Sequence, residues 1–346
     1  MLMRRSVTGA ALLLATGLAF AAPDSGTRIL SDRPLPKALG IISDLRWASA
    51  DSLFLAAGKS GALRLRFEPE WGEREILVPS GKSLWAAARI GASSRYLAVG
   101  APAHTVAWRK LPAGELQAVP LYTVVDLDVF EDRLVVLGAR KEERGRFAPD
   151  GAIAWIGSLD KNLADLKPVL FSVAGPGARP MDACGAFETG AVRFLGDGSF
   201  LVVPGVEPGI FLYDRTGKLL RSWEARAVGF DAECGLSDEQ MMLLSASLEP
   251  RSAWINQRRV LDDIIALPRG AGLLIRQVAN GKTNWQVKIL RRDGQVASHV
   301  LPFTGPSPHW HLRADVQSKR IAYLLKEYAA SAPPSPSRLV VTTLPE

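Results

Sequence analysis

The sequence has few of the residues on which catalytic and metal sites depend. It contains two cysteines and four histidines in 346 residues. It has no Gly-x-Ser-x-Gly, phosphate-loop or dinucleotide-binding glycine pattern. Its two cysteines, Cys184 and Cys234, fit no zinc or thioredoxin-type spacing. The sequence therefore gives no positive sign of a serine hydrolase, a nucleotide-dependent enzyme or a thiol redox protein.

A strong charge of one sign is also missing. The chain has 42 basic and 35 acidic residues, for a formal net charge of +7. Its lysines and arginines are scattered, whereas nucleic-acid binding usually needs a concentrated basic stripe with aromatic residues between the charges. We therefore expect no nucleic-acid partner.

Long hydrophobic runs are absent, but a short one follows the basic pair Arg4 and Arg5. Residues 10–20 are apolar except for Thr16 and Gly17, and this run is shorter than the about 20 residues that a spanning helix needs. A basic flank, a short apolar segment and small residues are typical of a cleavable signal peptide. We predict a signal peptide at 1–21 and an exported domain at 22–346 without a membrane span, in the periplasm or outside the cell.

Helical periodicity is missing, and short apolar strands separated by Gly, Pro, Asp and Ser recur instead. The clearest copy places the turn 196–198 and the turn 214–217 between strands, which gives two hairpins in series. Second strands of such units are predicted at 53–58, 96–100, 134–138, 200–203, 241–244, 273–278 and 321–325. Their mean spacing of about 45 residues is that of a propeller blade.

The predicted fold is therefore all-β, a single β-propeller of four-stranded antiparallel blades, with seven blades preferred and six as the alternative. A propeller must pair its two chain ends in one blade, because an open sheet edge would leave backbone groups unpaired. We expect residues 338–344 to form one strand of that blade and residues 27–30 to supply its partner.

Residues 197–203 and 211–219 resemble the repeat of bacterial secreted propellers of the NHL-like, six-bladed type, and residues 291–296 are similar to its outer turn. The resemblance covers about a fifth of the chain and rests on turns. It implies a propeller fold, and it implies no particular activity because propellers have many functions.

Each cysteine lies just ahead of a predicted repeat and is followed by Gly. An exported protein reaches a compartment that permits disulfides. We predict a disulfide between Cys184 and Cys234, with two buried free thiols as the alternative.

Two histidines lie two residues apart, at His309 and His311, where alternate side chains of a strand would share one face. They are weak candidates for a zinc site, since no third ligand is close in sequence. The alternative is a strand with two polar side chains at the channel or in a loop.

Acids recur near the predicted starts of first strands, at Asp44, Asp126 and Asp262 and also at Asp128 and Asp263. Similarly placed acids of successive blades would converge on the central channel, where they would bind Ca²⁺ or satisfy local backbone donors. The second and fourth units place Trp85 and Arg193 near the comparable position, which departs from a calcium site.

Two functions remain after these exclusions. We favour a non-catalytic exported module that needs no cofactor and binds a protein or an envelope glycan at the channel mouth. The alternative is a hydrolase or lyase with calcium or zinc in the channel. The predicted contact residues are Asp44, Trp85, Asp126, Arg193, Asp262, His309 and His311.

Overall fold

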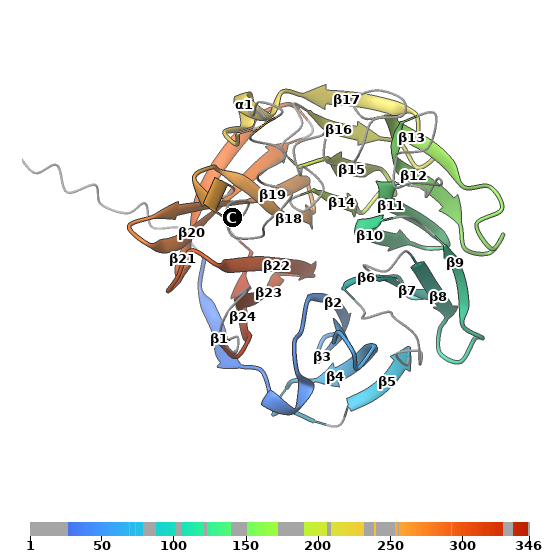
Figure 1. Ribbon diagram of the computed structural model, residues 1–346, viewed down its shortest axis with the longest axis horizontal. Coiled ribbons are helices and arrows are strands. Elements are labelled where there is room, and N and C mark those ends of the chain that lie inside the picture. Colours follow the sequence, from blue (N-terminus) through green and yellow to red (C-terminus); the bar gives the residue numbers. More distant parts are fainter. Residues whose placement is uncertain are drawn as a thin grey trace, which may run out of the picture.

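The computed structural model describes most of the chain, and the statements below concern only the residues that it describes. These are residues 27–68, 70–72, 74–78, 88–101, 105–120, 123–139, 151–171, 190–205, 209–231, 239, 253–254, 256–291, 293–327 and 335–344. Their strands form six four-stranded antiparallel sheets arranged radially around a central axis (Figure 1). The fold is thus a β-propeller.

Each blade begins with a strand beside the axis and proceeds outward, except that the last blade also takes the first strand of the chain. The blades are β2 to β5 (Asp44–Ser49, Ser52–Ala56, Ala62–Arg66, Arg74–Val78), β6 to β9 (Arg89–Ala92, Tyr96–Ala101, Thr105–Lys110, Gln117–Pro120), β10 to β13 (Thr123–Phe130, Arg133–Ala139, Ala152–Ser158, Lys167–Phe171), β14 to β17 (Ala191–Phe194, Phe200–Val203, Ile210–Tyr213, Leu219–Trp223), β18 to β21 (Val260–Leu267, Gly270–Ala279, Lys282–Arg291, Val296–Gly305), and β22, β23, β24 and β1 (Trp310–Gln317, Arg320–Glu327, Arg338–Thr343, Ile29–Pro34). The described helices are short, η1 (Lys37–Leu39) and α1 (Ala225–Val228).

Turn chemistry explains why the hairpins form where the sequence predicts them. In the turn between β16 and β17, Asp214 Oδ1 accepts hydrogen bonds from the backbone N–H groups of Thr216 at 2.8 Å and Lys218 at 3.0 Å. Gly217 follows with φ +87°, a conformation that other residues rarely adopt. The Asx turn and the glycine together reverse the chain and set the register of the hairpin.

The core lies between adjacent blades rather than inside any one of them. All residues of β3 and of β12 are buried, as expected for strands covered on both faces. At the junction of the first and last blades, Leu45 and Leu55 share one apolar cluster with Leu324 and Leu339. The packing of neighbours thus joins segments that are far apart in sequence.

The preference for seven blades is wrong, because the described strands make six. The repeat predicted at 241–244 is the surplus one, and it lies outside the described residues, in the segment between β17 and β18. No blade can fit between these two sheets: Arg193 Nε on β14 donates to the carbonyl oxygen of Ile264 on β18 at 2.9 Å. The sequence predicted an additional repeat because a short apolar run has the local pattern of a strand whether or not it pairs into a sheet.

The ring closes as expected, through a sheet that contains both ends of the described chain. Strand β1 pairs antiparallel with β24, with Arg33 opposite Leu339 and Asp32 opposite Val340. The partner strand begins two residues later than predicted and extends to Pro34. This pairing ties the first strand to the last blade by backbone hydrogen bonds.

Several predictions concern residues that are not described. The signal peptide at 1–21, Trp85, Cys184 and Cys234 all lie outside the described residues. In the part of the chain that the structure describes, no helix is long and apolar enough to cross a membrane.

Candidate functional site: the central channel

The channel is lined by the inner edges of β2, β6, β10, β14, β18 and β22 (Figure 1). An inner strand has no further strand on its axial side, so its backbone N–H and C=O groups there need other partners. Carboxylates from the preceding blade provide them. Asp44 Oδ2 accepts from the N–H of Ile90, and Asp126 Oδ2 accepts from the N–H of Val192, both at 3.0 Å.

Four further carboxylates do the same at 2.8 to 3.0 Å. The pairs are Asp128 with Phe194, Asp262 with Leu312, Asp263 with Ala314, and Asp315 with Trp47. Successive acids on one strand bind successive N–H groups on the next, so neighbouring inner strands run in the same direction along the axis. The acids therefore clamp adjacent blades together.

A β-bulge explains how two consecutive acids, Asp262 and Asp263, can both face the axis. In the pairing of β18 with β19, Leu261 lies opposite Ile275 and Asp263 lies opposite Leu274, so Asp262 is an additional residue. A bulge re-aims a side chain that normal alternation would turn to the other face.

Guanidinium groups replace carboxylates in the second and fourth blades. Arg89 Nε donates to the carbonyl oxygen of Val125 at 2.6 Å, and Arg193 Nε donates to that of Ile264. Arg193 Nη2 also donates to Asp263 Oδ1 at 3.0 Å. Acids of one blade thus cap N–H groups, and arginines of the next blade cap carbonyl groups.

Further arginines balance the buried acids. Arg46 Nη1 lies 3.2 Å from Asp44 Oδ1, and Arg313 Nη1 lies 3.4 Å from Asp263 Oδ1. Burial by itself would raise the pKa of Asp44, but the nearby Arg46, Arg313 and Arg89 outweigh burial and lower this pKa to about 2. Asp44 is therefore ionised at neutral pH although its side chain is fully buried.

One end of the channel, which we call the mouth, is formed at the starts of the inner strands. Here Asp262 Oδ2 accepts from Trp285 Nε1 at 2.7 Å, and Asp262 Oδ1 lies 3.1 Å from Arg276 Nε and 3.5 Å from His311 Nδ1. Burial and the charge of Arg276 lower the pKa of His311 to about 4 against the opposing effect of Asp262. His311 is therefore neutral at neutral pH.

Lys326 completes the mouth from β23, directly opposite His311 in the pairing of β22 with β23. Its Nζ donates to the carbonyl oxygen of Ser43 at 2.7 Å. Burial, followed by repulsion from Arg89 and Arg313, lowers the pKa of Lys326 to about 7. A lysine that titrates near neutral pH is unusual and is typical of functional sites.

The structure brings Asp44, Asp126, Arg193, Asp262 and His311 together at the channel. His309 lies apart, in the exposed turn before β22, so His309 and His311 do not share a strand face. The carboxylates face guanidinium groups, which disfavours a cation between them. Within the described ranges, no group of three or more His, Cys, Asp or Glu side chains is arranged to hold a metal ion.

Apart from Arg193, sequence reasoning missed the basic residues of the channel, and it also missed one of the acids. The missed residues are Arg46, Arg89, Arg276, Arg313, Lys326 and Asp315. A usable signal was present in the two inner strands where charged residues alternate with apolar ones, at Asp44 and Arg46 and again at Arg313 and Asp315. A charge every second residue on a buried strand indicates a polar channel face. Arg276 and Lys326 come from second strands, and no local pattern identifies them.

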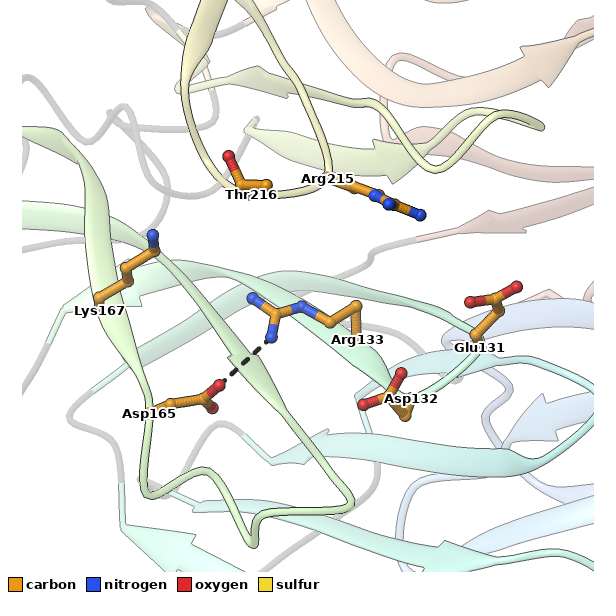
Figure 2. Close-up of a pocket in the computed structure, with 7 residues that line it drawn as sticks. All are labelled: Glu131, Asp132, Arg133, Asp165, Lys167, Arg215 and Thr216. Atoms are coloured by element: carbon orange, nitrogen blue, oxygen red, sulfur yellow. Dashed lines mark hydrogen bonds and ion pairs between the residues drawn. The ribbon is translucent and has the colours of Figure 1, made fainter.

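A second hollow lies on the opposite face, between the third and fourth blades (Figure 2). It has a volume of about 450 Å³ and is lined by Glu131, Asp132, Arg133, Asp165, Lys167, Arg215 and Thr216. Among these residues, Arg133 Nη1 lies 3.3 Å from Asp165 Oδ2. The hollow opens broadly to solvent, whereas the charged groups at the mouth are largely buried, so the mouth is the stronger candidate site.

Comparison with known proteins supports the fold alone. No family model and no curated protein matches the sequence. Among solved structures, a member of the DUF4221 family from Bacteroides vulgatus is 9% identical with a TM-score of 0.52, and the match covers 92% of this chain and 98% of that one. The WD40 β-propeller domain of Doa1 is 10% identical with a TM-score of 0.46, over 92% and 97% of the two chains. The NHL-like type expected from the repeat is not confirmed by these likenesses.

Proposed function

We propose that the protein is a non-catalytic binding module that acts after export, in the periplasm or outside the cell, and that it binds a protein or an envelope glycan at the channel mouth. Residues 1–21 support export, because they have the order of charges and small residues that signal peptidase requires. A propeller fold suits a binding role, because its rigid blades present variable groups at the ends of the channel.

The observation that carries the proposal is that the carboxylates of the channel are buried and already have partners, whereas several basic groups at the mouth are partly exposed. The carboxylates that would serve a metal or act as general bases are held by backbone N–H groups and arginines. At the mouth, by contrast, Arg89, His311 and Lys326 remain partly exposed. These accessible groups can contact a partner while the carboxylates keep their hydrogen bonds to the neighbouring blades.

Site-specific cross-linking tests the location of the partner. We would place a photoreactive amino acid at His311 or, as a control, at Lys319, which lies in the turn at the far end of the same hairpin. We expect irradiation with the native envelope fraction to give cross-linked products from position 311 alone. Products from position 319 alone, or equal products from both positions, would place the binding surface elsewhere.

A further inference from the structure

The charged groups at the mouth are layered, with nitrogen atoms outside and carboxylates beneath. The side chains of Asp44 and Asp126 are fully buried, and that of Asp262 is 3% exposed. The side chains of Arg89 and His311 are 16% and 33% exposed. A group that approaches the mouth therefore meets hydrogen-bond donors before any acceptor of the clamp.

Donor capacity remains unused at this layer. In the described part of the structure, buried Arg276 Nη2 has no hydrogen-bond partner, and Arg313 Nη1 has only ion-pair contacts, at 3.4 Å from Asp263 Oδ1 and 3.8 Å from Asp126 Oδ1. Lys326 uses one of its three hydrogens on Ser43, and an ammonium group can donate all three. Buried donors without partners are costly, and a bound acceptor would remove that cost.

The electrostatic surroundings at the mouth also favour an anion. Burial and then the charge of Arg313 lower the pKa of Arg89 to about 10, in spite of nearby Asp126 and Asp44. The pKa of Lys326 is lowered in the same way, by burial and by repulsion from Arg89 and Arg313, in spite of the attraction of Asp44 and Asp262. Burial is thus the main cause that disfavours the charged forms of Arg89 and Lys326, and a bound anion would stabilise those charged forms.

From this layering we infer that the mouth binds a carboxylate of an acidic peptide segment through Arg89 and Lys326, with His311 beside it. The inference rests on the proposed function and adds the chemistry of the partner.

A single carboxylate fits the mouth better than a dianion. Among the described residues along the channel, six cations face six carboxylates, so a bound anion adds negative charge that the channel does not already balance. These groups are Arg46, Arg89, Arg193, Arg276, Arg313 and Lys326 against Asp44, Asp126, Asp128, Asp262, Asp263 and Asp315. A phosphate dianion would add two uncompensated charges in a poorly solvated site, and a carboxylate adds one.

A peptide is favoured over a glycan because sugar rings commonly stack on exposed aromatic side chains. Trp285 and Trp310, the tryptophans next to Asp262 and His311, are 1% and 3% exposed and cannot offer a ring face. An acidic glycan is therefore the alternative that the experiment must separate.

The inference predicts a pH dependence with a definite sign. The groups that face Lys326 are Arg89 on β6, Arg313 and His311 on β22, Asp44 on β2 and Asp262 on β18. A carboxylate beside Lys326 raises its pKa, so binding takes up a proton where free Lys326 is neutral. Affinity should therefore fall as pH rises above about 7.

The experiment measures binding of a fluorescent Gly/Glu peptide to the mature chain by polarisation between pH 6 and 9. The matched Gly/Gln peptide controls for the carboxylates, and trigalacturonate is the acidic-glycan arm. We expect Lys326→Met to weaken binding of the Glu peptide by about tenfold or more, and Lys319→Met to leave it unchanged. Lys326→Arg should retain binding but lose the pH dependence near 7, because arginine stays charged.

Equal binding of the Glu and Gln peptides overturns the inference, as does affinity that is unaffected by Lys326→Met or independent of pH in the wild type. Binding of trigalacturonate alone overturns the choice of a peptide in favour of an acidic glycan. If no acidic ligand binds while cross-linking at position 311 still captures a partner, the carboxylate site fails and the binding function stands. If Lys326→Met does not fold, the wild type and Lys326→Arg decide the question through their pH profiles.

Discussion

The acids of the channel show how one residue can serve two blades. Asp263 Oδ2 accepts from the N–H of Ala314 on the next blade, while its Oδ1 accepts from its neighbour Ile264 and from Arg193 of the preceding blade. Replacing such an acid leaves a buried arginine and an edge N–H group without partners. The channel acids that we expected to contact a ligand thus hold partners on neighbouring blades, and the basic groups beside them that remain partly exposed are Arg89, His311 and Lys326.

Asp44 makes this structural role measurable through pH. Its pKa is about 2 in the folded chain and 3.8 in the absence of structure, so its contribution to the free energy of unfolding is complete above about pH 5 and is lost as pH falls toward about 1. The shift corresponds to about 2 kcal/mol. We expect Asp44→Asn to be less stable than the wild type by about this amount at pH 6, and the difference to shrink between pH 4 and pH 2. Urea unfolding at several pH values would show it, and a constant difference would contradict the assignment.

At the scale of the elements, the sequence predicted six of the six second strands, at β3, β7, β11, β15, β19 and β23, together with the strand at the C-terminal end. Turn residues and β-branched runs are local signals, and they mark these hairpins correctly. The blade count failed because it depends on which strands pair across the ring, which is set by long-range contacts such as that of Arg193 with Ile264. The same limit applies to the channel acids. Local sequence places an acid near the start of a strand, but the groups that its side chain contacts belong to other blades and cannot be read from local sequence.

Ring closure is the element-scale feature that a truncation tests. Removing residues 22–34 deletes β1 and leaves β24 as an unpaired edge of a three-stranded blade. We expect the loss of β1 to cost a few kcal/mol of stability. Each kcal/mol lowers the melting temperature of a domain of this size by about 2 °C, so the melting temperature should fall by about 5 °C or more. A control that removes only residues 22–26 keeps β1 and should melt as the wild type does. Equal melting of both truncations would mean that β1 adds nothing to closure.

At the scale of the whole molecule, the proposed export requires residues 1–21 to act as a signal peptide that directs the chain across a membrane. Cleavage after Ala21, or one residue later, would lower the formal net charge from +7 to +5, because Arg4 and Arg5 are removed with no acid. Mass spectrometry of the exported form should therefore find an N-terminus at Ala22 or Pro23. An intact Met1 in the mature pool would contradict export by this route.

Export also bears on the cysteines, because they flank one blade of the ring. Cys184 precedes β14 and Cys234 follows β17, so a bond between them would close a loop that contains the whole fourth blade. Closing a loop of about 50 residues would stabilise the fold by about 4 kcal/mol in the chain-entropy model. We expect peptide mapping without reductant to find the linked pair, and Cys184→Ser to melt at a lower temperature than the wild type. Cys184→Ser should also match the reduced wild type, because each lacks only the cross-link. Two freely alkylated thiols in the native exported protein would exclude the disulfide.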